Sequence, residues 1–523
     1  MSQQNNVLSE TGKETRAAET ELLVEDVKSP LLNKVRQNYR IFGSISLIFG
    51  GTLTMFFYRA GIGLNLFLFS LVMVILLAVS SKKLGIPVKK EAVACYLGTL
   101  LLGISGMLTA SPTLHFLNIC GILLLLELSL VLQFGKESRD FAGMLAKIFS
   151  FPFYCIAAIG FPFIDGNRFL KETRAFKNDK FRNILIGSII ALPLLLVSTL
   201  LLSSADLVFG KITSRAFTIV FSNEIIPVLM LIVLGFVACY CILCGAADVA
   251  VGRTKECAKA DPVIAITVIA LLLAVYLLFC GIQVAYLFTE GWFELPAEFT
   301  YAQYARRGFF ELLTVTCFNL LLILICMNVF REHRLLKALM TGITACTYIM
   351  IASSAYRMLL YIGEYHLTFL RLFVLLFLFI DTLILAGILI SVYRKDFPLF
   401  GYCVTVISVC YLLFSFSKPD AYIASYYISH TERAELDLGF LTKELSFDAA
   451  AEVLPVLQSS YEGLRESSGE YNPYHEAYLY TKYDIRSYYD DIINRKKGMG
   501  IRGFNLSNYL AAESVVKYPI NRE

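Results

Sequence analysis

Two carboxylates stand inside long apolar stretches of the sequence, where an ionisable group is unusual. Glu127 lies within Leu-Leu-Glu-Leu-Ser and Asp381 within Phe-Ile-Asp-Thr. An ionisable group surrounded by hydrocarbon is costly, so it marks an ion or proton pathway, or it stays neutral and packs against a neighbouring helix. The sequence leaves two interpretations open: a proton- or cation-coupled carboxylate, as in a transporter, or a structural contact.

A second group of ionisable residues gathers near the ends of several apolar stretches. On a continuous helix Arg307 and Glu311 form an i,i+4 pair, and Arg357 shares a face with Glu364. Such arginines can form salt bridges and snorkel, or bind an anionic group such as a lipid phosphate or a peptide carboxylate. We expect Arg357 and Arg371 to converge on Glu311 beneath the C-terminal segment. The candidate residues are Arg306, Arg307, Glu311, Arg357, Tyr361, Glu364 and Arg371.

Motifs of soluble enzymes are missing. The sequence contains no Walker A loop, no His-Glu-x-x-His and no Gly-x-Ser-x-Gly. The five histidines lack metal-ligand spacing, and Cys239, Cys241 and Cys244 lie within an apolar stretch, where cysteine acts as a small hydrophobic residue. We therefore expect no metal and no cofactor, and the sequence does not indicate an enzyme.

Composition shows what kind of element positions these residues. Of the 523 residues, 57% are hydrophobic and 17% are charged, whereas soluble globular proteins have about 45–50% and about 25%. The charges concentrate in residues 1–40 and 418–523. This profile predicts a membrane domain at 41–416 between a largely disordered polar N-terminal tail and a soluble C-terminal segment. It excludes an ordinary soluble enzyme and a nucleic-acid-binding protein.

Eleven apolar runs are long enough to cross a bilayer, and each must be helical because an isolated strand would leave its backbone groups unsatisfied in lipid. The predicted fold class is therefore all-α, a polytopic helical membrane protein. The stretch 148–164 is different: basic residues flank it on both sides, and it contains Pro152 and Pro162. We interpret it as re-entrant or interfacial; the alternative is a true span. The predicted spans are 41–57, 62–80, 92–110, 114–134, 184–203, 225–247, 263–287, 309–329, 338–356, 370–393 and 399–416.

Basic residues in the short loops predict the orientation. With a cytoplasmic N-terminus, the inside segments carry 27 Lys and Arg and the outside loops carry 7. Cytoplasmic loops are enriched in Lys and Arg. We therefore expect a multi-pass plasma-membrane protein with its N-terminus in the cytoplasm and its C-terminus outside.

The C-terminal segment 418–523 is predicted to form a small helical extracytoplasmic domain. Its apolar residues from Phe447 to Leu464 recur every three or four positions, which is typical of an amphipathic helix. Further helices are expected through Ile485 and after Ser507, a potential N-cap. The segment contains no cysteine, so no disulfide can stabilise it.

Several short motifs resemble a known family. The string from Tyr304 to Leu312, Tyr-Ala-Arg-Arg-Gly-Phe-Phe-Glu-Leu, is the most specific of them. Together they resemble a bacterial polytopic membrane family called domain of unknown function 4173, formerly grouped with 4153, best over about residues 180–510. The chain departs from the family pattern at Lys418, Tyr427 and His430. The resemblance implies a bacterial envelope protein and supplies no activity, substrate or cofactor. The other motifs are Arg357-Met-Leu-Leu-Tyr361, Leu367-Thr-Phe-Leu-Arg371, Pro419-Asp-Ala421 and Phe504-Asn-Leu-Ser507.

Three functions compete at this point. The first is a non-enzymatic envelope protein that positions its exported C-terminal domain for a partner. The second is a secondary transporter or channel that uses Glu127 or Asp381, although no pair of matching broken spans indicates inverted repeats. The third is a membrane enzyme or binder for an anionic lipid-linked substrate at the outer face. The expected partners are the lipid bilayer and, depending on the function, an envelope protein or an anionic lipid, and nucleic acid is not an expected partner.

Overall fold

The structure is a computed structural model that describes residues 29–135, 141–172, 179–222, 225–249, 259–287, 309–466 and 475–520. Within these residues the chain is helical and has no strand beyond an isolated bridge between Ala260 and Phe330. By length and composition, eleven helices in the described part of the chain could cross a membrane. The predicted all-α polytopic fold is therefore confirmed.

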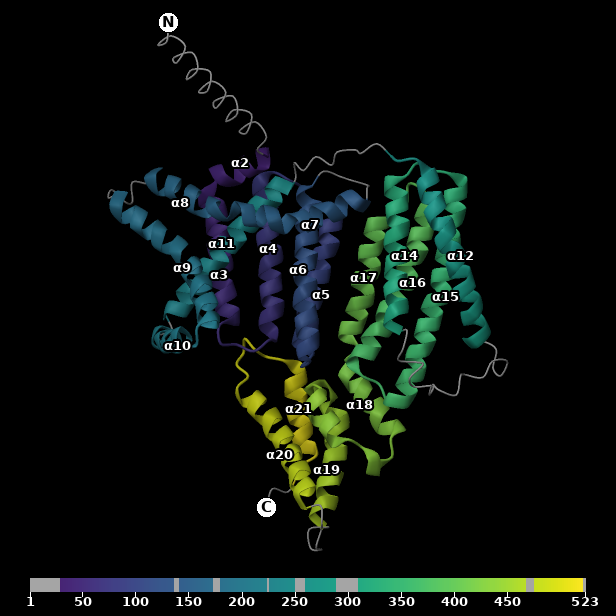
Figure 1. The fold of residues 1–523 in the computed structure, drawn as a ribbon. Helices are drawn as coiled ribbons and strands as arrows, with labels where there is room; N and C mark the ends of the chain where they lie inside the picture. Colours follow the sequence, from purple (N-terminus) through teal and green to yellow (C-terminus); the bar gives the residue numbers. More distant parts are fainter. Residues whose placement is uncertain are drawn as a thin grey trace.

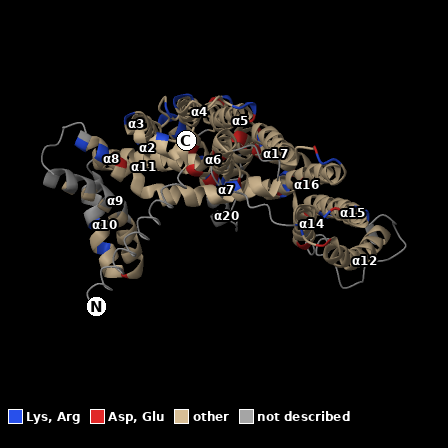
Figure 2. Cartoon of the chain, turned by 90° about the horizontal axis from the view of Figure 1, so that it is seen from above, with Lys and Arg blue, Asp and Glu red and all other residues tan. Residues whose placement is uncertain are grey.

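The membrane helices form two groups, visible side by side in Figures 1 and 2. Each group has its own apolar core. The first group contains α3 (Tyr39–Phe57), α4 (Leu64–Leu84), α5 (Lys90–Leu108), α6 (Pro112–Phe134) and α11 (Ile225–Val249). The second contains α12 (Pro262–Leu287), α14 (Phe309–Val329), α15 (Arg334–Tyr365) and α16 (Phe369–Tyr393), and α17 (Leu399–Phe416) lies between the groups.

Glycine allows the closest helix crossing in the first group. A Cβ atom at Gly50 of α3 would lie 2.3 Å from the carbonyl oxygen of Ile232 in α11, and one at Gly235 would lie 2.7 Å from the Cα of Gly50. Small residues let two backbones approach within a membrane. Gly50 and Gly235 therefore form the close contact between α3 and α11.

The segment after α6 lies across the ends of the other helices. In both views α7 (Phe141–Ala157) runs crosswise at the end where α2 (Pro30–Gln37) lies (Figures 1 and 2). The ring of Phe141 packs on Phe400, in the first turn of α17. A 3-10 turn, Ala158–Gly160, leads into α8 (Phe161–Glu172). Pro152 does not end the helix, because it lies inside α7.

Ten of the predicted spans coincide with candidate membrane helices. The exception is 184–203, which lies within α9 (Asp179–Ala205) and is not among them, whereas Phe141–Lys171 is, by length and composition. The helices α9 and α10 (Leu207–Ser222) lie at the edge of the first group (Figures 1 and 2).

The C-terminal helices pack together at the end opposite to α2 (Figure 1). Leu454, Leu457 and Tyr461 are fully buried, as the amphipathic pattern predicts. The N-cap of α21 is Asn505 instead of Ser507, because the Asn505 side chain accepts a hydrogen bond from the backbone N–H of Asn508. The helices are α18 (Pro419–His430), α19 (Ala450–Glu466), α20 (His475–Lys497) and α21 (Leu506–Lys517).

Candidate functional site

Hydrogen bonds from buried groups hold the C-terminal helices on the turn between α5 and α6. The carboxylate of Asp448 accepts from the backbone N–H of Ala110 (2.6 Å) and from the hydroxyl of Thr109. The amide of Asn505 donates to the carbonyl oxygen of Thr109 (2.6 Å). Because Asp448, Asn505 and Thr109 are all buried, these contacts fix the position of the C-terminal helices relative to the membrane helices.

The turn between α3 and α4 contacts the loop before α21. The backbone N–H groups of Leu64 and Asn65 donate to the carbonyl oxygens of Phe504 and Arg502, both at 2.8 Å. A Cβ atom at Gly63 would lie 2.2 Å from the Phe504 oxygen, so only glycine permits this approach. The loop has the sequence Gly-Met-Gly-Ile-Arg-Gly, in which the glycines are Gly498, Gly500 and Gly503.

These two turns and the loop line an open cavity of about 860 Å³. Three arginines line it, Arg59 from the α3–α4 turn, Arg495 from the last turn of α20 and Arg502 from the loop. All three are exposed. No Asp or Glu is among the described residues that line the cavity. We call this cavity the arginine pocket.

Local contacts position each guanidinium. Arg502 donates to the carbonyl oxygen of Met55 (2.5 Å), and Arg495 lies 5.5 Å from the ring centroid of Phe447. Arg59 has a φ of 51°, in the left-handed region that residues other than glycine adopt at a cost in free energy. Retained backbone strain of this kind concentrates at functional sites.

Apolar side chains lie at the same level as the arginines. Phe116, in the first turn of α6, lines the arginine pocket and is 66% exposed, and Ile501, between Gly500 and Arg502, is 87% exposed. The pocket also has one polar atom with no hydrogen-bond partner in the described part of the chain, the Oδ1 of Asn508. A ligand with a negative charge, a hydroxyl group and an apolar portion would match this arrangement.

Arginine is well suited to phosphate because its planar guanidinium donates two parallel hydrogen bonds. The three arginines bring positive charge together, and no Asp or Glu is among the described residues that line the pocket. Such an arrangement can bind a phosphate group. The described residues contain no group of His, Cys, Asp or Glu that could hold a metal ion.

The structure gives contacts for two of the predicted arginines, Arg357 and Arg371. Arg357 is 5% exposed and donates to the Oε1 of Gln283 (3.1 Å). Arg371 donates to the carbonyl oxygen of Tyr365 (2.6 Å) and to that of His366, and its guanidinium lies 4.3 Å from the ring centroid of Tyr361. Arg371 therefore caps the end of α15, as basic residues near helix C-termini do.

Two of the predicted residues, Tyr361 and Arg371, do meet. Glu311 and Glu364 are exposed. The described contacts give the two guanidiniums separate partners, Gln283 for Arg357 and the end of α15 for Arg371, and the convergence on Glu311 stays a prediction. Arg306 and Arg307 lie outside the described residues.

The two intramembrane carboxylates lie in different groups of helices. Glu127 of α6 lines an apolar cavity of about 320 Å³ between α3, α4, α6, α7 and α11, and its Oε1 has no hydrogen-bond partner among the described residues. Asp381 of α16 is buried in the second group. No contact joins them.

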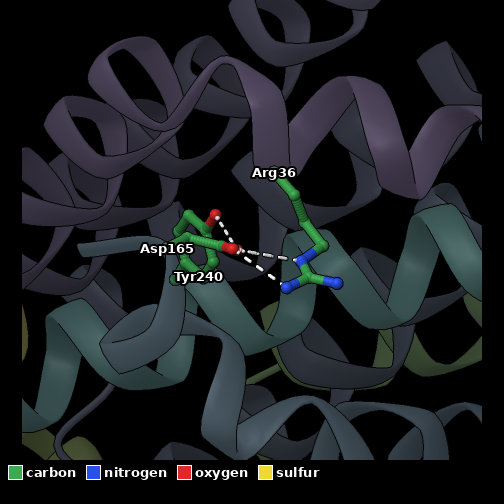
Figure 3. Close-up of polar contacts among 3 residues, drawn as sticks. All are labelled: Arg36, Asp165 and Tyr240. Atoms are coloured by element: carbon green, nitrogen blue, oxygen red, sulfur yellow. Dashed lines mark hydrogen bonds and ion pairs between the residues drawn. The ribbon is translucent and has the colours of Figure 1, made fainter. Parts of the chain in front are cut away.

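A second polar cluster lies at the opposite end of the first group. Figure 3 shows the carboxylate of Asp165 in α8 between the guanidinium of Arg36 in α2 and the hydroxyl of Tyr240 in α11. Arg36 donates from Nε to Oδ2 and from Nη2 to Oδ1, both at 3.0 Å, and the Tyr240 hydroxyl donates to Oδ2 at 3.0 Å. Asp165 is 1% exposed, so this cluster is an internal contact that ties α2, α8 and α11 together.

The arginine pocket was missed from sequence because its arginines lie far apart in the chain. In the sequence, Arg59 is a basic residue in a predicted outside loop, whereas Arg495 and Arg502 lie in the C-terminal segment. The glycine-rich loop from Gly498 to Gly503 was the one available signal. Glycine spacing of this kind permits close backbone approach.

Comparison with known sequences identifies a family but no activity. The sequence model of the family described as "Domain of unknown function (DUF4153)" matches residues 96–455. The match therefore begins earlier than the motifs near residue 180 indicated. Neither the curated proteins nor the solved structures gave a match. Since the family model covers more than half of the sequence, the chain belongs to the DUF4153 family.

Proposed function

We propose that this protein is a multi-pass plasma-membrane protein that binds a phosphate-bearing lipid at the outer membrane interface, in the arginine pocket. One observation carries the proposal: three arginines from three separate chain segments line one cavity, and no Asp or Glu is among its described lining residues. The pocket lies where α3 ends and where α4 and α6 begin. Ends of membrane helices stand at the level of the lipid headgroups.

The surroundings of the pocket support a lipid over a fully soluble anion. Phe116 and Ile501 are exposed beside the arginines, and Met55, whose carbonyl oxygen accepts from Arg502, is exposed as well. Acyl chains would contact these side chains while the phosphate lies among the guanidiniums. The lone Asn508 oxygen would accept a hydrogen bond from a headgroup hydroxyl.

The orientation is part of the proposal. The excess of basic residues in the loops on the α2 side supports a cytoplasmic N-terminus. The crosswise position of α7 and α8 at that end supports an interfacial segment around 148–164 (Figure 1). Together they leave the C-terminal helices outside. The resemblance to the 4173 motifs supports a bacterial envelope.

The C-terminal helices have two roles in this proposal. They supply Arg495 and Arg502 to the pocket, and their attachment through Asp448 and Asn505 holds them in place for an envelope partner. We assign no reaction to the pocket, since it offers cations and no nucleophile or general base beyond His115. The role that we propose is that of a binder and platform.

Lipid binding can be tested on the full-length protein in neutral detergent by calorimetry. The probes are dihexanoyl phosphatidic acid, dihexanoyl phosphatidylcholine and inorganic phosphate. We expect the phosphatidic acid to bind most tightly, and Arg495→Ala and Arg502→Ala each to weaken it about tenfold, as expected for hydrogen bonds to a charged group. Arg433→Ala, at an exposed arginine outside the pocket, is the matched control and should change nothing.

Equal binding of the two lipids, or unchanged affinity in both variants when their thermal unfolding matches the wild type, would refute the site. Inorganic phosphate that binds as tightly as the lipid would assign the pocket to a free anion. Orientation is tested separately: a reporter fused after Glu523 should be extracytoplasmic, and one at Ala260 cytoplasmic.

A further inference from the structure

The second group of helices contains a carboxyl group that is buried without a hydrogen-bond donor. Asp381, at the middle of α16, is 2% exposed, and neither of its oxygens has a hydrogen-bond partner within the described ranges. The nearby hydroxyl of Thr316 in α14 is close enough to interact with the carboxyl group, but the hydrogen bond whose geometry is established for it goes to the carbonyl oxygen of Leu313 (2.9 Å). Such a group is rare, since buried polar atoms nearly always have a partner.

Other buried oxygen-bearing side chains lie on the same face of α14. Asn319 follows Thr316 by three residues, so the two share a face. The hydroxyl of Tyr276 in α12 donates to the Oδ1 of Asn319 (2.9 Å), and the Asn319 amide donates to the hydroxyl of Thr347 in α15 (3.0 Å). Thr316, Asn319 and Thr347 are fully buried. A polar network therefore joins α12, α14 and α15 next to Asp381.

The polar line continues toward the C-terminal helices. Gln283 stands two turns beyond Tyr276 on α12, and its Oε1 accepts from the hydroxyl of Ser353 (2.8 Å) and from Arg357 (3.1 Å) in α15. Polar side chains thus follow the facing sides of α12 and α15 from mid-membrane toward one end. Polar residues inside a helix bundle mark ion and proton routes more often than lipid-facing contacts.

The other titratable groups near Asp381 on the packed helices are few. Cys317 of α14 and Tyr348 of α15 lie within electrostatic reach of it, and Tyr402 of α17 donates to the carbonyl oxygen of Leu383, two residues further along α16. Thiol and phenol groups are neutral at physiological pH. No cation in the described residues is paired with Asp381 in an ion pair. A bare carboxylate at this position would be strongly unfavourable.

We infer that Asp381 binds a small monovalent cation, a proton or an alkali ion, at the middle of the second group of helices. One carboxylate compensates one positive charge, and the neighbouring hydroxyl and amide oxygens are the ligand type that hard cations prefer. The inference does not depend on the arginine pocket, because the two sites lie in different groups of helices and share no residue.

Thermal unfolding of the full-length protein in detergent tests this inference. Wild type and Asp381→Asn are compared from about pH 5 to about pH 9, the range where a perturbed carboxyl can titrate, with and without sodium chloride against choline chloride. If the ligand is a proton, the wild-type midpoint falls by several degrees as pH rises, and the variant lacks this fall. If it is sodium, sodium chloride raises the wild-type midpoint at high pH and leaves the variant unchanged.

Thr382→Val, a neutral change on the next residue of α16, is the matched control and should keep the wild-type response. Labelling with a hydrophobic carbodiimide provides a second measurement: the wild type should be modified at Asp381, less at high pH or when sodium is bound. If Asp381→Asn does not fold, Asp381→Glu replaces it. This variant should keep a dependence of the unfolding midpoint on pH or sodium, but over a shifted range. The inference would be overturned if the unfolding midpoints of wild type and Asp381→Asn changed in the same way with pH and with sodium chloride. Unchanged lipid binding in Asp381→Asn would show that the arginine pocket is independent of the Asp381 site.

Discussion

Arg36 and Asp165 form a two-point ion pair across 129 residues of sequence, with Nε to Oδ2 and Nη2 to Oδ1 distances of 3.0 Å. This geometry joins α2 to α8, and the Tyr240 hydroxyl adds α11 to the same carboxylate. The segment that lies across the helix ends is therefore anchored at α8 by charge and at Phe141 by packing against Phe400.

Asp165→Asn should destabilise the protein by about 3–5 kcal/mol, because it leaves a guanidinium facing a neutral amide in a buried site. Arg36→Lys should also destabilise it, since an ammonium cannot reproduce the two-point contact. Chemical or thermal unfolding in detergent measures both. Arg40→Lys, on the exposed side of α3, is the control. A variant Asp165→Asn as stable as wild type would show that the pair contributes nothing.

Gly50→Ala should be poorly tolerated, because its Cβ would lie 2.3 Å from the Ile232 carbonyl oxygen of α11. Overpacking against a side chain costs about 1–3 kcal/mol, and backbone contact leaves less room to relax. The adjacent Gly51 has nothing within 4 Å of its added Cβ. Gly51→Ala should therefore be neutral or slightly stabilising. Thermal midpoints of the two variants should separate clearly, and equal midpoints would contradict the close crossing.

Arg59→Gly should separate stability from binding. Glycine adopts the φ of 51° found at residue 59 without strain, so the variant should be more stable than wild type by about 1 kcal/mol. The same change removes one of the guanidiniums of the arginine pocket and should weaken phosphatidic acid binding. Calorimetry and thermal unfolding on one preparation check both effects. A variant that is stabilised and binds as well as wild type would place Arg59 outside the ligand site.

Asp420 should make the attachment of the C-terminal helices sensitive to pH. Burial raises the pKa of this α18 carboxyl above its ordinary value of 3.8, the nearby Asp448 raises it further, and hydrogen bonds from Ser446 oppose the change. The folded state then binds the proton more tightly than the unfolded state, so stability falls as pH rises from the ordinary value through the folded pKa. Asp420→Asn should remove this decline, and unfolding curves recorded against pH will show it. A decline that persists in the variant would assign it to another group.

The sequence by itself determined that the chain is helical and embedded in a membrane. Length and apolarity suffice for this conclusion, because a backbone in lipid must satisfy its hydrogen bonds within each helix. The amphipathic spacing around Leu454, Leu457 and Tyr461 also predicted correctly which side of α19 is buried. These are local properties, since each depends on residues only a few positions apart.

Only the tertiary structure decided which distant residues meet. The sequence pointed to Arg357, Arg371 and Glu311, but Arg357 is bonded to Gln283 and Arg371 caps α15. The arginine pocket instead joins Arg59 to Arg495 and Arg502. Periodicity reports which face of a helix is apolar and says nothing about which helix faces it. That choice depends on packing, such as the crossing at Gly50 and the bonds from Asn505 to the α5–α6 turn, and packing is a property of the whole bundle.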